Sequence, residues 1–134
     1  MELVRKEVIP YQWDALNDRV EGATPSFCMH NFKAAGKLNR EKKEKGNTFI
    51  APKYTYRGFE VLPEDPKQLK DDEFYGFVFQ DSDFSKWIEA GWIILLTQHP
   101  DPELEKIADG AIDIVCAAQQ DDGYLDTYYI FKWS

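Results

Sequence analysis

The sequence predicts a mainly α-helical fold made of antiparallel helical hairpins, and two neighbouring segments are the reason. From Asp81 to Gln98 the chain is apolar on nearly all sides of a helix, which is typical of a buried helix. The segment that starts at Pro102 instead carries one apolar stripe and a charged face, which is typical of a peripheral helix. A buried helix joined by a short turn to an amphipathic one forms a helical hairpin, the unit of bundles, solenoids and α/α toroids.

Composition limits the possible functions before any motif is considered. The 134 residues suit one domain, and 43% apolar with 15% aromatic residues exclude a disordered acidic chain. A net charge of −8 disfavours binding to nucleic acid or to an anionic membrane. The longest apolar run, Gly91–Leu96, is too short to span a membrane. Charges close to Met1 leave no place for a signal peptide, so we expect a cytoplasmic location.

The cysteines and histidines of the chain show no metal-binding spacing. Cys28 and Cys116 lie far apart, without a CxxC motif or a nearby His pair. This arrangement argues against a zinc site or a disulfide framework and favours two buried thiols. His30 is expected to be an imidazole with satisfied hydrogen bonds, and His99 a turn residue.

The first part of the chain contains two helix signals. Apolar residues near helical spacing predict a helix from Glu2 to about Val20. Pro10 must begin or kink this helix, because it has no amide hydrogen to donate. A shorter helix is expected over 26–35, with Ser26 as its amino-terminal cap and Gly36 as its stop.

Residues 37–74 are predicted to form a long loop or insertion within a single domain, residues 1–134. The block from Lys37 to Arg57 has an excess of positive charge and no apolar period, which indicates a solvated loop or a frayed helix end. A basic segment that binds a partner is the alternative. Proline and glycine interrupt the chain from there to about Glu73. A short hairpin in this region would use Phe49, Tyr54, Tyr56 and Phe59.

The hairpin of the second half predicts which segments are neighbours. Asp81 and Ser82 suit the amino-terminal cap of the buried helix, and Asp101 suits that of the next. In an antiparallel pair, the start of the first helix and the end of the second lie at the same end. Residues 79–83 should therefore neighbour residues 119–124. Residues 128–131 alternate too little to assign, and a strand is one expectation.

Five motifs follow one another along nearly the whole chain. They are Ile9–Trp13 (IPYQW), Asn31–Gly36 (NFKAAG), Phe79–Ala90 (FQDSDFSKWIEA), His99–Leu104 (HPDPEL) and Ala118–Thr127 (AQQDDGYLDT). Their order and spacing resemble the amino-terminal part of glycoside hydrolase family 127, whose members include β-L-arabinofuranosidases on an (α/α)6 barrel. The resemblance implies an arc of an (α/α)6 toroid, because the barrel needs many more helices than are expected here. Residues 37–74 depart from the family pattern, in which the chain passes more directly from Ala-Ala-Gly to Phe-x-Asp-Ser-Asp.

The resemblance also implies a retaining mechanism. In the family a Cys thiolate is the nucleophile, a Glu is the acid/base, and zinc held by three Cys and a Glu orients the nucleophile. These residues lie beyond the equivalent of position 134, and neither Cys28 nor Cys116 matches them. We therefore expect no catalytic residue, no metal ligand and no cofactor in this chain, although zinc is implied for the family.

The candidate substrate-binding residues lie where the two helix ends are predicted to meet. Asp81 and Asp83 could form the carboxylate pair of a retaining glycosidase, but helix capping explains both without catalysis. A third interpretation is a sugar subsite, in which amides and carboxylates bind hydroxyl groups and an aromatic ring packs on the sugar. Its candidate residues are Gln80, Asp81, Asp83, Lys86, Trp87 and Tyr124.

The leading functional hypothesis is a segment of a glycoside hydrolase that acts on L-arabinofuranosides or related sugars and is inactive alone. The alternatives are a free-standing acidic helical module that binds a protein and a free-standing sugar-binding module. An isolated arc is expected to expose surface around its four tryptophans, and each large apolar side chain left in water forgoes roughly 1.5–3 kcal/mol. We therefore expect self-association or pairing with the rest of a barrel, with carbohydrate as the partner of the parent enzyme.

Overall fold

Helices make up most of the computed structural model, which describes residues 2–52, 59–97 and 101–133. The helical elements are η1 (Val4–Val8, a π-helix), α1 (Ile9–Leu16), α2 (Cys28–Lys45), η2 (Gly46–Thr48, a 3-10 helix), α3 (Asp81–Thr97), α4 (Pro102–Ala118) and α5 (Thr127–Trp133). Strands β1 (Glu60–Val61) and β2 (Gly76–Phe77) form one short antiparallel pair. The predicted mainly α fold is confirmed. Within the described ranges, no helix combines the length and the apolar composition that a membrane span requires.

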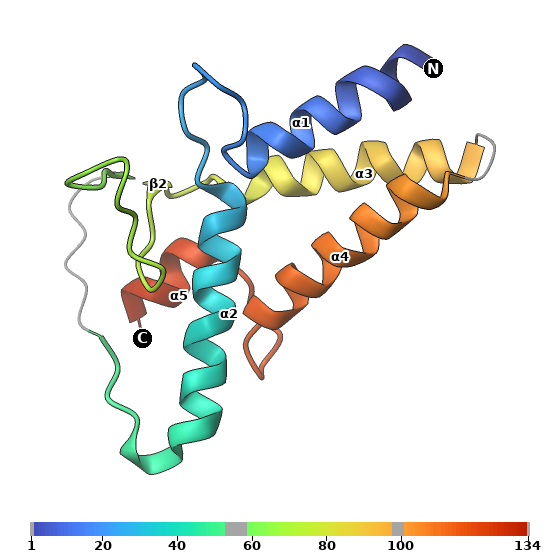
Figure 1. Ribbon diagram of the computed structural model, residues 1–134. Helices are drawn as coiled ribbons and strands as arrows, with labels where there is room; N and C mark the ends of the chain where they lie inside the picture. Colours follow the sequence, from blue (N-terminus) through green and yellow to red (C-terminus); the bar gives the residue numbers. More distant parts are fainter. Residues whose placement is uncertain (1, 53–58, 98–100, 134) are drawn as a thin grey trace.

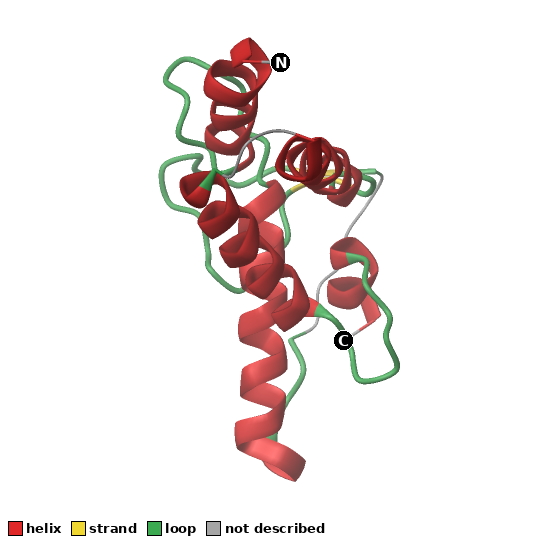
Figure 2. Cartoon of the chain, turned by 90° about the vertical axis from the view of Figure 1, so that its right-hand side faces the viewer, coloured by secondary structure: helices red, strands yellow, loops and turns green. Residues whose placement is uncertain are grey.

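α3, α4 and α5 pack against α2, which extends beyond them at its carboxyl end (Figures 1 and 2). α1 lies beside α3, and the most extensive contact in the fold joins α2 to α4. The end of α3 and the start of α4 lie near each other and the two helices diverge from there, so the end of α4 meets α2 (Figure 1). Asn39 Nδ2 donates there to the carbonyl oxygens of Ala117 (2.9 Å) and Gln119 (3.2 Å). The start of α3 contacts Thr127 instead, just past the predicted segment 119–124.

α2 continues past Gly36, so the prediction that this glycine ends the helix is wrong. Gly36 lies where α2 crosses α4, and a Cβ atom added to it would be 3.3 Å from the Cβ of Ala117. The residue therefore serves close helix packing, and the helix ends at Gly46, whose φ is +50°. Residues 37–45 are consequently helical rather than a loop. Whether 37–74 is an insertion stays a prediction.

The segment that precedes α2 is held by a residue that the sequence did not indicate. Asp18 accepts hydrogen bonds from the backbone amides of Ser26 and Phe27, whereas Ser26 Oγ accepts from the Cys28 amide at 3.4 Å. The helix thus begins at Cys28 rather than at Ser26. In the helix predicted from Glu2 to about Val20, Pro10 lies in the first turn of α1, directly after η1, as expected. The helix ends at Leu16, earlier than predicted.

Three other local predictions need correction or fall outside the described residues. Residues 127–133 form α5, not a strand. A short antiparallel pair joins Glu60 to Phe77 and Val61 to Gly76, and the carbonyl oxygen of Phe59, one of the four predicted hairpin residues, accepts from the Val78 amide beside it. Tyr54, Tyr56 and His99 lie outside the described residues.

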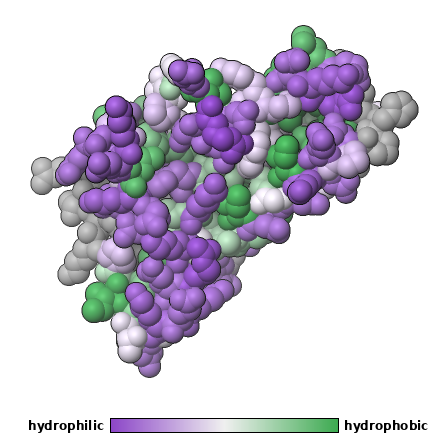
Figure 3. Space-filling view, viewed as in Figure 1, coloured by the Kyte–Doolittle hydropathy of each residue, from purple (hydrophilic) through white to green (hydrophobic). Residues whose placement is uncertain are grey.

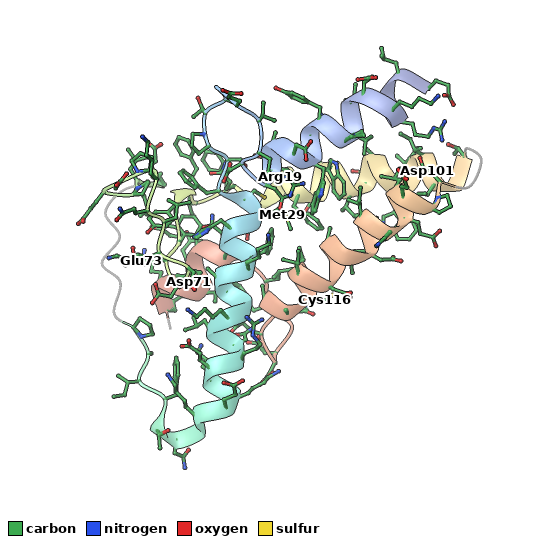
Figure 4. All side chains as sticks on the ribbon, viewed as in Figure 1. Arg19, Met29, Asp71, Glu73, Asp101 and Cys116 are labelled. Atoms are coloured by element: carbon green, nitrogen blue, oxygen red, sulfur yellow. The ribbon has the colours of Figure 1, made fainter. Side chains whose placement is uncertain are left out.

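The loop before α3 is attached to the first half of α2. Asn31 is fully buried, and its side chain donates to the carbonyl oxygen of Tyr75 (2.7 Å) and accepts from the Tyr75 amide (2.9 Å). The His30 ring lies 2.8 Å from the carbonyl oxygen of Glu73, which satisfies this imidazole as expected. Lys37 pairs with Asp71 at 2.9 Å. Asp71 and Glu73 therefore lie alongside α2, far from Asp101 at the start of α4 (Figure 4).

The tryptophans, part of whose surface an isolated arc was expected to expose, differ in exposure. Trp87 is 3% exposed, whereas Trp92 is 38% and Trp133 69% exposed. Further exposed apolar side chains include Leu3, Ile50, Phe59, Leu62, Phe79 and Ile93. One face shows hydrophobic residues as separate patches on a largely hydrophilic surface (Figure 3). Trp87 is therefore part of the buried core, whereas Trp92, Trp133 and the other exposed apolar side chains leave apolar surface in contact with water.

Candidate functional site

A hollow of 440 Å³, named here the α1–α3 hollow, lies between α1 and the first half of α3. From α3 it is lined by Asp83, Lys86, Trp87 and Ala90, and from α1 and the loop before α2 by Gln12, Ala15, Leu16 and Ser26. Positions three and four apart share one helix face, which is why Asp83, Lys86 and Trp87 meet here. Three of the six predicted substrate-binding residues therefore line one hollow.

Trp87, the aromatic residue that lines this hollow, is stacked on Trp13, which lines a different hollow. The rings of Trp13 and Trp87 have centroids 4.6 Å apart and planes at 27°. Trp87 Nε1 donates to the carbonyl oxygen of Ile9 at 3.1 Å, so its one polar atom is satisfied. Because Trp87 is nearly fully buried, a ligand would reach only its edge. The exposed Asp83 and Lys86 offer a carboxylate and an ammonium group at the rim.

Gln12 and Ser26 are hollow-lining residues that the sequence analysis missed. Gln12 could have been found, because it lies three and four residues before Ala15 and Leu16 on one face of α1. Ser26 could not have been found in this way, because its position depends on the hydrogen bond that its backbone amide donates to the Asp18 carboxylate. Together with Asp83 and Lys86 they supply an amide, a hydroxyl, a carboxylate and an ammonium group.

Asp81 lies away from this hollow and holds α5. Its two carboxylate oxygens accept hydrogen bonds of 2.7 Å from the backbone amide and the hydroxyl of Thr127, the first residue of α5. Asp81 therefore caps α5 rather than its own helix. Because residues two apart on a helix do not face each other, Asp81 and Asp83 do not present their carboxylates side by side.

The side chain of Gln80 also forms hydrogen bonds within the fold. Its Oε1 accepts from the Phe77 amide at 2.9 Å, and its Nε2 lies 3.4 Å from Ser26 Oγ. A Cβ atom on Gly76, whose φ is +95°, would collide with Gln80 Oε1. Tyr124 lies in a different hollow, beside Tyr129 and Trp133. The six predicted residues thus divide among four places, and their role in substrate binding stays a prediction.

The buried Asp81 makes stability depend on pH in a specific direction. Burial raises the pKa of its carboxyl above the ordinary value of 3.8, the bonds from Thr127 oppose the rise, and Asp126 adds to it. The folded state then holds the proton more tightly than the unfolded chain. The contribution of Asp81 to stability therefore falls as pH rises from 3.8 through its native pKa.

We expect Asp81→Asn, which cannot titrate, to lose this part of the pH dependence. The Tm of the wild type minus the Tm of the variant should be largest at acidic pH and should fall as the pH rises to neutral. Thermal unfolding followed by circular dichroism at both pH values measures it. If the Tm of the wild type minus that of the variant is equal at both pH values, or is larger at neutral pH, the assignment is contradicted.

The cysteines do not fit the zinc and thiolate chemistry that the family resemblance implies. Burial raises the pKa of the Cys28 thiol to about 12, with the Asp81 charge adding to the rise, and Sγ lies 3.6 Å from the carbonyl oxygen of Gln80. Cys28 is buried as expected, but Cys116 is exposed on α4, which corrects the prediction of two buried thiols. Two cysteines cannot supply three thiolate ligands. Across residues 2–52, 59–97 and 101–133, no three His, Cys, Asp or Glu side chains gather as a metal site.

Three helices packed against α2, with α1 on α3 and a hollow between α1 and α3, define a mainly α-helical protein. The family model of the β-L-arabinofuranosidase GH127 catalytic domain matches residues 1–133. The chain belongs to glycoside hydrolase family 127, and the resemblance inferred from its motifs is confirmed.

Two relatives show how much of a family member this chain represents. It is 39% identical over 127 residues to the non-reducing end β-L-arabinofuranosidase of Bifidobacterium longum subsp. longum, which covers 95% of this chain. The crystal structure of a GH127 β-L-arabinofuranosidase from Geobacillus stearothermophilus T6 superposes with a TM-score of 0.67 and 42% identity over 98% of this chain. The chain spans 16% of the length of each relative.

Proposed function

We propose that this chain is the amino-terminal segment of a glycoside hydrolase acting on β-L-arabinofuranosides or related sugars, to which it contributes part of the sugar-binding surface. The family match over 1–133 and two relatives named as β-L-arabinofuranosidases support the substrate class. The observation that carries the proposal of a sugar contact is the α1–α3 hollow, which Gln12, Asp83 and Lys86 line together with the edge of the Trp87 ring. Amides and charged groups beside an apolar floor suit a polyhydroxy ligand. A cytoplasmic location remains a prediction from the sequence.

The nucleophile and its metal are proposed to lie in the remainder of the domain, an (α/α)6 toroid of which these helices are an arc. Cys28 supports this, because a thiol with a pKa near 12 is not a thiolate at neutral pH. Asp81 supports it too, because its oxygens are engaged by Thr127. The chain alone should therefore bind sugar weakly and hydrolyse nothing.

We expect the purified 134 residues to release no aryl alcohol from an aryl β-L-arabinofuranoside. The assay is made with wild type and with Asp81→Ala, and the Geobacillus stearothermophilus enzyme serves as the positive control. Turnover by the wild-type chain that Asp81→Ala abolishes would overturn the proposal, because it would place the chemistry within these residues.

Exposed apolar surface supports pairing of this chain with more polypeptide of the domain or with itself. Trp92 and Ile93 on α3 are 38% and 50% exposed although they lie in an otherwise apolar helix. We expect the average mass from static light scattering to rise above that of a monomer as concentration increases. A monodisperse monomer with a cooperative melt at all concentrations would favour the free-standing module instead.

A further inference from the structure

A second hollow, of 590 Å³ and named here the α5 hollow, lies between α2, the turn at 120–124 and α5. Three aromatic rings form a cluster in it. The centroid of the Trp133 ring lies 4.8 Å from that of Tyr129 and 6.2 Å from that of Tyr124. Trp133 is 69% and Tyr124 40% exposed, so ring surface faces the solvent.

The turn that carries the polar groups of this hollow is fixed by its own hydrogen bonds. Asp122 Oδ1 accepts from the Tyr124 amide at 2.9 Å, and the Gln120 amide donates to the Tyr124 carbonyl oxygen at 2.9 Å. Gly123 supplies the positive φ, +89°, that the turn needs. Asp81 holds the adjacent start of α5 through Thr127. Rings and carboxylates are thus placed before a ligand arrives, which lowers the entropy cost of binding.

Charges of both signs surround the three rings. Asp121 and Asp122 line the hollow together with Lys42. Lys43 Nζ lies 3.9 Å from Asp121, and Lys132 Nζ lies 5.8 Å from the centroid of the Tyr129 ring. A bound cation would meet these ammonium groups, and an anion would meet the carboxylates. A neutral ligand with many hydroxyl groups can use both signs as hydrogen-bond partners.

We propose that the α5 hollow binds a neutral sugar ring. Trp133 and Tyr124 pack against its C–H face, and Asp122 and Lys42 form hydrogen bonds with its hydroxyl groups. This site is separate from the α1–α3 hollow and shares no lining residue with it. The inference rests on the proposed function only for the choice of an L-arabinofuranoside as the sugar to test.

The test is a titration of the ¹⁵N-labelled chain with methyl β-L-arabinofuranoside, with tetramethylammonium chloride as the cationic comparison. The indole N–H resonance of Trp133 is assigned by its loss in Trp133→Ala. We expect this resonance to shift saturably with the sugar while that of the buried Trp87 stays fixed. Trp133→Ala should weaken binding, measured at the Tyr124 amide, by about tenfold, a size typical of one aromatic contact. Phe79→Ala, which removes another exposed ring, should leave the affinity unchanged.

Three results would overturn the inference. These are no shift of the Trp133 resonance with the sugar, equal affinity in Trp133→Ala and wild type, and saturable binding of tetramethylammonium at the same resonances. Sugar binding lost in Lys86→Ala but kept in Trp133→Ala would place the sugar in the α1–α3 hollow and leave the proposed function standing. Sugar binding at Trp133 combined with hydrolysis by the chain alone would support the α5 hollow as a sugar site and overturn the proposed function.

Discussion

Replacing Trp87 by alanine should lower the free energy of unfolding by about 3–5 kcal/mol, the range for large aromatic deletions in a core. The change removes a ring that is 3% exposed and stacked on Trp13. It also leaves the carbonyl oxygen of Ile9 without the indole donor that it has at 3.1 Å. Because this ring joins α1 to α3, the loss should separate the two helices that form the α1–α3 hollow.

Urea unfolding followed by circular dichroism measures the effect, and two variants sharpen it. Trp133→Ala removes the same side chain from an exposed position and should change stability far less. Trp87→Phe keeps a ring but loses the N–H donor and should fall between wild type and Trp87→Ala. A Trp87→Ala chain as stable as Trp133→Ala would show that the stacked pair does not hold the core together.

Replacing Asn31 by alanine should cost about 2–4 kcal/mol. Its buried amide pairs with both backbone groups of Tyr75, and each buried polar group left unpaired costs about 1–3 kcal/mol. Residues 70–76 would then lose one of their attachments to α2, so their backbone amides should exchange with deuterium faster than in wild type, while the amides of α4 keep their rates.

Asn39→Ala is the matched control, because Asn39 lies on the same helix and bonds backbone carbonyl oxygens in a more exposed place. Its loss should cost only about 0.5–1.5 kcal/mol. Equal losses for the two variants, or unchanged exchange at 70–76 in Asn31→Ala, would contradict the role given to Asn31.

The sequence predicted the fold where local signals and tertiary packing agree. The cap of α4 by Asp101, which accepts from the Leu104 amide, follows from such a signal. α3 also starts at Asp81 as predicted, although the Asp81 side chain caps α5 instead. The end of α2 did not follow from a local signal, because Gly36 is a helix stop by propensity but a packing residue against Ala117. α5 was missed because it is short and its start depends on Asp81, far away in the chain.

The candidate site was predicted only in part, because residues adjacent in one motif point to different places. Helical spacing brings Asp83 and Lys86 into one hollow, which periodicity alone could reveal. The divergence of α3 and α4, which turns Asp81 to Thr127 and puts Tyr124 in the α5 hollow, is a property of helix packing. No pattern within a single helix encodes it.

A chimera tests the central claim most directly: residues 1–133 replace the matching segment of the Geobacillus stearothermophilus enzyme, and hydrolysis of an aryl β-L-arabinofuranoside is measured. We predict that the chimera is active and that Lys86→Ala in it lowers kcat/KM, while Lys106→Ala on the outer face of α4 leaves it unchanged. A chimera that folds with a cooperative melt but has no activity would contradict the claim that this chain supplies a working part of such an enzyme.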